Sequence, residues 1–286
     1  MPRVLDTMAG FEAFARKASL QTPYVREDLW KEKYEGAYPE VFEAFYATHG
    51  DPAGRAAVVR QLSQVKERVE GAAAVVRKAI NDVEKAMPKL LDRPPEPSPQ
   101  HVLMVGTLTT NAAVGQLGDD IAVFHCLEWF QDADGARVLV AHETTHAWHE
   151  LALGAEPPDQ DAAWMAFYEG VAIAASRALI PGRPEVDYFW YGHPDVDAWL
   201  PWCQEHDQEL MDHFAASIDA PATVETYFGG GVIQNQWRVG FYLADQLVTK
   251  LNRSLPDLVT MNVMEARAAI REALGLEPLD PRPGPH

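Results

Sequence analysis

The sequence predicts an α+β protein in which a small β-sheet is preceded and followed by helices. Apolar residues recur every three or four positions through residues 58–87, as on one face of an amphipathic helix. Residues 101–108 and 120–130 are instead short runs rich in Val, Ile and Phe, which is typical of strands. Helical patterns return after residue 135. Helices, then strands, then helices along one chain is an order typical of an α+β fold.

Residues 1–97 are predicted to form a helical N-terminal region. Its apolar stripe consists of Val58, Leu62, Val65, Val69, Ala72, Val76, Ile80, Val83 and Met87. This stripe fits one long helix or two helices broken near Gly71, because glycine disfavours a helix interior. The proline-rich residues 93–100 then end the helical pattern.

Residues 98–277 are predicted to form a second domain, and residues 278–286 a Pro/Gly-rich tail. The expected order is a strand at 101–108, a strand at 120–130, a turn at Asp134-Gly135, a helix over 136–153 and a helix over 161–180. Gly154, Pro157 and Pro158 should stop the first of these helices, and Pro181-Gly182 the second.

The charge and the cysteine content restrict the class of protein. Because 24 basic and 42 acidic residues give a net charge of −18, binding to nucleic acid or to an anionic membrane through a basic patch is not expected. Cys126 and Cys203 are too few for a disulfide framework or a CxxC metal motif, and buried thiols fit a reducing compartment. The N-terminus lacks the layout of a signal peptide, and no segment reaches the roughly 18 apolar residues of a membrane span. We therefore expect a cytoplasmic protein.

The stretch VLVAHETTHAWHELA, residues 138–152, places three histidines and two glutamates directly after an apolar run. His142 and His146 are four residues apart, so on a helix they lie on one face, one turn apart. Two imidazoles so placed can bind one tetrahedral Zn²⁺ at roughly 2.0–2.1 Å each. Glu143, next to the first ligand, is placed to take a proton from metal-activated water. The HExxH spacing thus predicts two metal ligands and a general base.

A catalytic zinc ion needs a third protein ligand, for which the sequence offers two candidates. His149 lies about 10 Å along the helix axis from His142, too far for both to bind one ion comfortably in a straight helix. Glu169 lies on the next predicted helix, among Trp164, Met165, Phe167, Tyr168, Val171 and Ile173. A carboxylate on such an apolar helix is costly unless a partner such as a metal compensates it, so we predict Glu169 as the third ligand. The metzincin pattern HExxHxxGxxH is excluded, because His149 and Ala152 stand where it requires Gly and His.

The sequence HETTH, followed by an aromatic-rich helix with Glu169-Gly170-x-Ala172, resembles the gluzincin metallopeptidases. Within that group it most resembles the peptidase-MA-like and predicted zinc-dependent protease families, and WRVGFYLADQLV (237–248) is similar to their downstream segment. The resemblance covers roughly residues 100–275. It implies one zinc ion held by His142, His146 and Glu169, with Glu143 as the base. It also implies a zincin-like fold, with a small, twisted, mostly antiparallel sheet packed on the active-site helix. Ile173 departs from some gluzincins, which carry an acidic residue there.

Peptide hydrolysis builds an oxyanion, for which a Tyr, His or Arg commonly donates a hydrogen bond. Arg238, Tyr242, Asp245 and Thr249 share one helical face. One interpretation has Tyr242 and Arg238 facing the cleft, with Tyr242 donating to the oxyanion; the alternative has this stripe facing water. His125 and His193 are further candidate donors, and Gly229–Gly231 is either a mobile flap or a turn.

The leading hypothesis is therefore a zinc metallopeptidase that acts on a peptide or protein substrate. A second hypothesis is a non-catalytic protein in which zinc is structural or regulatory and the helical N-terminal region binds a partner. In that case His149 would be a fourth ligand in a distorted helix. A third is a zinc hydrolase of a non-peptide amide or ester, which would use the same residues. The sequence indicates neither the cleavage specificity nor the oligomeric state.

Overall fold

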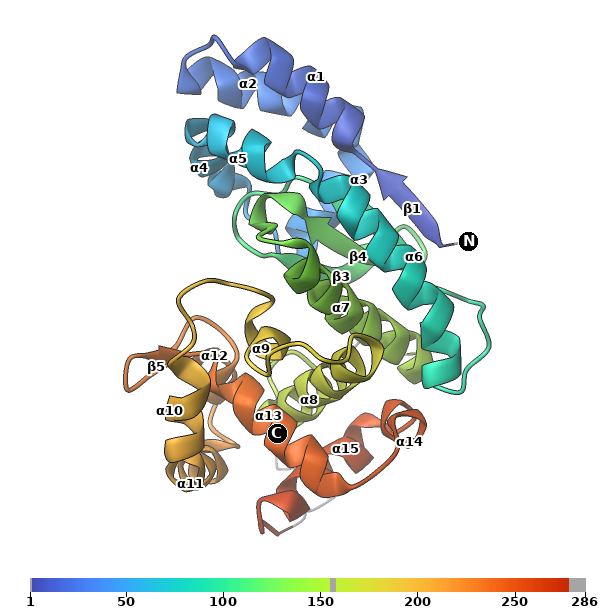
Figure 1. Ribbon diagram of the computed structural model, residues 1–286, viewed down its shortest axis with the longest axis vertical. Coiled ribbons are helices and arrows are strands. Elements are labelled where there is room, and N and C mark those ends of the chain that lie inside the picture. The colour runs from blue at the N-terminus through green and yellow to red at the C-terminus, as the bar shows by residue number, and fades with distance from the viewer. Residues whose placement is uncertain (1, 155–157, 278–286) are drawn as a thin grey trace, which may run out of the picture. The chain divides into compact units, whose positions relative to one another are not determined.

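The protein is described here by a computed structural model that covers residues 2–154 and 158–277 (Figure 1). The chain divides into two units, one of Met1–Pro88 with Pro94–Leu151 and the other of Lys89–Arg93 with Ala152–His286. This division differs from the boundary expected at residue 97. The reason is a strand at residues 3–6, which the sequence analysis missed and which joins the N-terminal helices to the sheet.

The first unit contains a four-stranded sheet in the order β1-β2-β4-β3. Its strands are β1 (Arg3–Asp6), β2 (Gln100–Met104), β3 (Ala112–Leu117) and β4 (Asp120–Cys126). β1 pairs with β2, and β2 with β4, in parallel; only β3 and β4 are antiparallel. The sheet is therefore mixed, and the prediction of a mostly antiparallel sheet is wrong. A two-residue turn at Gly118, which has a φ of 63°, forces β3 and β4 to be antiparallel, whereas the long helical connection from β1 to β2 allows parallel pairing.

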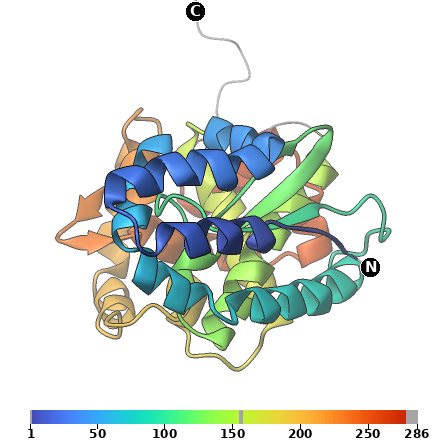
Figure 2. The same ribbon diagram turned by 90° about the horizontal axis from the view of Figure 1, so that it is seen from above.

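The described residues of the first unit also form seven α-helices, the last two of which end just beyond its bounds. They are α1 (Met8–Ala18), α2 (Pro23–Lys33), α3 (Pro39–Thr48), α4 (Arg55–Arg60), α5 (Leu62–Val69), α6 (Ala72–Leu90) and α7 (Ala133–Leu153), with 3₁₀ turns at Glu35–Ala37, Pro52–Gly54 and Leu127–Trp129. The helices α1 and α2 lie side by side as a hairpin (Figure 2). Of the two arrangements that fit the apolar stripe, the structure has the break near Gly71, which has a φ of 82° and separates α5 from α6. A further break at Gln61 separates α4 from α5.

The two faces of the sheet carry different side chains, since successive residues of a strand point to opposite faces. On one face, the ring of Phe124 lies 6.0 Å from that of Phe45 in α3. On the other face, His125 of β4 and His101 of β2 form a hydrogen bond with each other, and His101 is also hydrogen-bonded to Glu84 of α6. One face thus belongs to the apolar core, while the other contains a buried polar cluster.

The helix α7 begins earlier than the sequence analysis predicts. Asp134 and Gly135, expected as a turn, lie in its first turn because Asp132 Oδ1 accepts hydrogen bonds from both of their backbone N–H groups. The predicted end at Gly154 is confirmed, and this glycine has a φ of 63°. Pro157, also expected to stop the helix, lies outside the described residues, as does the predicted tail at 278–286.

The second unit is mainly helical. It contains α8 (Ala162–Leu179), α9 (Asp187–Trp190), α10 (Trp199–Glu205), α11 (Asp207–Ser217), α12 (Thr223–Tyr227), α13 (Val239–Leu251), α14 (Leu255–Val259) and α15 (Val263–Ala273), with a hairpin of β5 (Val232–Ile233) and β6 (Gln236–Trp237). The predicted helix over 161–180 is confirmed as α8, and Asp161 caps it by accepting from the N–H of Trp164. α8 packs against α13 at Gly170, where a Cβ would lie 2.4 Å from the carbonyl oxygen of Ala244. Among the described residues, no helix combines the length and apolar character needed to cross a membrane.

Candidate metal centre

His142 and His146 lie one turn apart on α7, and their Nε2 atoms converge. These two atoms are 3.1 Å apart, and the ring planes are nearly perpendicular at 87°. Only 1% of His142 and 5% of His146 is exposed. Two nitrogens bound to one tetrahedral zinc ion at 2.0–2.1 Å would be about 3.3 Å apart. The spacing of the imidazoles therefore fits two ligands of one ion.

Glu169, on α8, completes the group that the sequence predicts. One potential ligand atom from each of His142, His146 and Glu169 can be chosen so that all lie within 4.8 Å of one another. The Glu169 side chain is 8% exposed, so it does not face solvent as a glutamate on an amphipathic helix usually does. Two neutral imidazoles and a carboxylate are a donor set used by catalytic zinc sites, in which a fourth position remains for water or substrate. The three residues can therefore hold a divalent metal ion.

Glu143 follows His142 directly and is only partly buried, unlike the two histidines beside it. Its carboxylate lies close enough to β4 to affect Cys126: burial, Glu128 and Glu143, in that order, raise the pKa of this thiol well above its usual value. Glu143 is therefore near the C-terminal end of β4 and outside the group of potential ligands.

His149, the alternative third ligand, is not a member of the group formed by the described residues. Its side chain is fully buried, and burial together with the neighbouring His146 lowers the pKa of His149 to about 3. His149 is thus a neutral imidazole in the interior of the first unit.

Tyr242 and Arg238, the predicted oxyanion donors, belong to the start of α13. Tyr242 is only 4% exposed and Asp245 only 7%, whereas Thr249 is exposed. The stripe therefore faces water at Thr249 but not at Tyr242 and Asp245. The Tyr242 hydroxyl donates to Asp207 Oδ1 at 2.9 Å, and burial together with this carboxylate raises the pKa of Tyr242. Tyr242 would have to leave Asp207 before it could donate to an oxyanion.

The other two candidate donors have local partners. His125 lies in β4 with its Nε2 3.1 Å from His101 Nδ1, and burial followed by the neighbouring His101 lowers its pKa well below the usual value. His193 is exposed, and its Nδ1 lies 2.8 Å from the carbonyl oxygen of Pro194. Gly229–Gly231 connects α12 to β5, and Gly230 N–H donates to Glu225 Oε1 at 2.9 Å, as in a turn.

Two buried carboxylates of the first unit were missed by the sequence analysis. Glu84 is hydrogen-bonded to His101 and to Trp148. Glu128 accepts hydrogen bonds from the backbone N–H groups of Gly106 and Leu108. A signal for Glu84 exists, since it lies four residues after Ile80 on the apolar stripe of α6. We find no comparable signal for Glu128.

Comparisons of the chain with protein-family models, with curated proteins and with solved structures gave no match.

Proposed function

We propose that this protein is a zinc-dependent peptidase that uses Glu143 as its general base. The observation that carries the proposal is the group of His142, His146 and Glu169, whose potential ligand atoms lie within 4.8 Å of one another. The HExxH spacing supports a catalytic role, because a purely structural metal site has no use for the glutamate at position 143. Among the described residues this group offers three potential ligands, which suits catalysis better than a closed structural site.

The chemistry of each residue follows from its place on α7 or α8. A bound zinc ion would polarise the substrate carbonyl and lower the pKa of a water molecule. His142, His146 and Glu169 would hold and orient that ion. Glu143 takes a proton from the attacking water and transfers it to the leaving amide nitrogen, which makes it both a base and an acid in one turnover. As part of this proposal the substrate is a peptide or protein in the cytoplasm, where the buried thiols of Cys126 and Cys203 remain reduced.

The test combines metal content with cleavage of a mixed peptide library. The parent protein should bind one zinc ion per chain and cleave peptides. Glu143→Gln should retain the zinc and lose at least a hundredfold in cleavage rate, because the base is lost while all three ligands remain. Glu169→Ala should lose zinc affinity as well as activity. Glu67→Gln, which changes an exposed glutamate on α5, is the matched control and should behave like the parent.

Three results would contradict the proposal or narrow it. Cleavage by Glu143→Gln at the parent rate would show that the base is assigned wrongly. If the zinc affinity of Glu169→Ala equalled that of the parent, Glu169 would not be the third ligand. Stoichiometric zinc without peptide cleavage would favour a non-catalytic zinc protein, unless the parent hydrolyses aryl esters or non-peptide amides in a reaction that Glu143→Gln abolishes.

A further inference from the structure

Arg238 adopts a backbone conformation that an arginine rarely takes. Its φ of 59° and ψ of 24° place it in the left-handed region, directly before α13. In this conformation the Cβ of a residue other than glycine is crowded against the backbone, so the conformation persists only where surrounding contacts hold it. Such residues concentrate at binding and catalytic sites.

Three aromatic rings hold the side chain of Arg238. Its guanidinium carbon lies 3.8 Å from the ring centroid of Phe241, and 5.5 Å from those of Trp190 and Tyr191. Stacking against ring faces fixes the plane of a guanidinium group while leaving its N–H donors directed outward at the edges. Arg238 is thus a preoriented cation.

No acidic side chain neutralises this cation among the residues that the structure describes. Arg238 takes part in none of the ion pairs and side-chain hydrogen bonds found there, and its Nε is buried without an acceptor. Other arginines of the same unit are paired: Arg177 with Asp245, and Arg271 with Asp219. A buried N–H without an acceptor is unfavourable, so an acceptor that a ligand brings would relieve this cost.

The surroundings of Arg238 favour an anion with an apolar neighbour. The N-terminus of α13, a helix of 13 residues, adds positive potential at this position. The adjacent Trp237 is 60% exposed, and its backbone carbonyl accepts a hydrogen bond from Trp199 Nε1 at 2.7 Å. A fixed guanidinium edge beside an exposed indole matches a carboxylate that is attached to an apolar group.

We propose that Arg238 binds a carboxylate through its guanidinium edge, and that the ligand is the C-terminal residue of a short peptide. Trp237 would cover the apolar side chain of that residue. The choice of a peptide rests on the proposed peptidase function, whereas the recognition of a carboxylate rests on Arg238 alone. If the protein both cleaves peptides and binds a carboxylate at Arg238, it selects substrates that have a free C-terminus.

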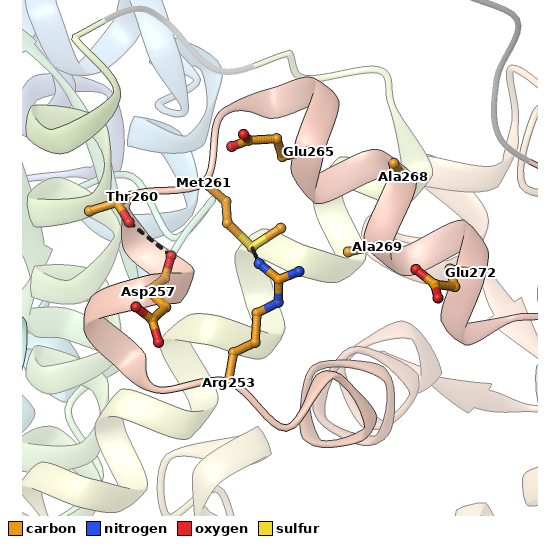
Figure 3. A pocket seen from close by; sticks show the side chains of 8 residues that line it. All are labelled: Arg253, Asp257, Thr260, Met261, Glu265, Ala268, Ala269 and Glu272. Carbon is orange, nitrogen blue, oxygen red and sulfur yellow. Dashed lines mark hydrogen bonds between the residues drawn. The ribbon is translucent and has the colours of Figure 1, made fainter.

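A second arginine, Arg253, serves as the comparison. Arg253 projects into a pocket of about 730 Å³ that is also lined by Asp257, Glu265 and Glu272 (Figure 3). Its Nη1 lies 3.7 Å from Met261 Sδ. Because three carboxylates line this pocket, they oppose the binding of an anion. Arg253 is therefore a matched arginine that should not recognise a carboxylate.

Binding is measured by calorimetry on the full chain carrying Glu143→Gln, which prevents cleavage. The probes are a tripeptide ending in phenylalanine, the same tripeptide as its C-terminal amide, and inorganic phosphate. We expect the acid to bind at least tenfold more tightly than the amide and more tightly than phosphate. An added Arg238→Gln should abolish the preference for the acid, Arg238→Lys should reduce it because the planar fork is lost, and Arg253→Gln should leave it unchanged.

Equal affinity for the acid and the amide would overturn the proposal, as would a preference that survives Arg238→Gln. Phosphate binding as tight as that of the acid would overturn the assignment to a carboxylate. If Arg238→Gln fails to fold by circular dichroism, Arg238→Lys decides the same question. Failure of the proposed peptidase function would be distinguishable from this. In that case the parent would bind no zinc or would cleave no peptide, while the protein still bound the acid more tightly than the amide.

Discussion

Glu84 and His101 form a buried pair in which Glu84 Oε1 lies 3.0 Å from His101 Nε2. The same carboxylate oxygen accepts a hydrogen bond from Trp148 Nε1 at 3.1 Å, and His101 Nδ1 in turn lies 3.1 Å from His125 Nε2. All four side chains are buried. One carboxylate therefore links α6 to β2 and to α7, the helix that carries His142 and His146.

Replacing Glu84 with leucine should destabilise the protein by about 2–6 kcal/mol. The substitution keeps the size of the side chain but replaces the carboxylate with an apolar group, so the buried donors of His101 and Trp148 lose their acceptor, each at a cost of about 1–3 kcal/mol. The shift in the midpoint of urea unfolding measures this loss. Asp82→Asn on the same helix removes an exposed ion pair with Lys78 and should shift the midpoint little. A Glu84→Leu variant as stable as the parent would show that the cluster contributes no net stability.

The fold could be predicted from the sequence where one element has a strong pattern of its own. The apolar stripe over residues 58–87, the strands near 101 and 120, and the helix over 161–180 all appear in the structure. The strand at residues 3–6 could not be recognised, because four residues carry almost no periodicity and its partner strand lies 97 positions away, as in the pair Arg3 and Gln100. β3 was missed for a similar reason, since AAVGQL has a glycine and only two large apolar residues.

The candidate site was more predictable than the sheet. His142 and His146 depend only on the pitch of one helix, which the sequence specifies. Glu169 required the additional argument that a carboxylate on an apolar helix needs a partner, and its burial agrees with that argument. The partner of Tyr242 could not be predicted, because its hydroxyl reaches Asp207, 35 positions away, through tertiary packing alone.

Zinc should stabilise the parent protein against unfolding. A ligand that binds only the native state contributes about 2.7 kcal/mol when its free concentration is 100 times its dissociation constant. Thermal unfolding with and without zinc, and after addition of a chelator, measures this effect. His146→Ala should remove most of the shift, whereas His193→Ala, at an exposed histidine, should preserve it. Equal stabilisation of His146→Ala and the parent would place the bound zinc elsewhere.

Gly170→Ala should destabilise the protein by at least about 2 kcal/mol. The new Cβ would lie 2.4 Å from the carbonyl oxygen of Ala244 and 2.4 Å from Val248 Cγ2, so α8 and α13 would have to separate. Because Glu169 is the preceding residue, zinc affinity should fall as well. Ala174→Ser also adds one heavy atom to α8, at a partly exposed position, and should have little effect on either quantity. Unchanged stability of Gly170→Ala would mean that the two helices adjust without cost.

Glu128 should make the stability of the protein fall as the pH rises towards neutrality. Burial raises the pKa of this carboxyl to about 7, against an ordinary value of 4.5, although the backbone N–H groups of Gly106 and Leu108 favour its charged form. Between these two pH values the folded protein keeps a proton that the unfolded chain has released. The resulting stabilisation is complete below pH 4.5 and is lost as the pH rises through 7. A pKa difference of this size corresponds to about 3 kcal/mol.

The measurement compares the unfolding free energy of the parent with that of Glu128→Gln between pH 4.5 and 8. Glutamine does not titrate. Relative to Glu128→Gln, the parent should therefore lose up to about 3 kcal/mol of unfolding free energy as the pH rises across this range. The titratable groups around Glu128, namely Cys126, Tyr34 and Arg68, stay in both proteins. Burial keeps the pKa of Cys126 and of Tyr34 above their ordinary values, so neither group loses its proton in the folded protein between pH 4.5 and 8, and the difference isolates Glu128. A difference that is independent of pH would show that the Glu128 carboxyl has the same pKa in the folded and unfolded chain, and that its two backbone hydrogen bonds offset its burial.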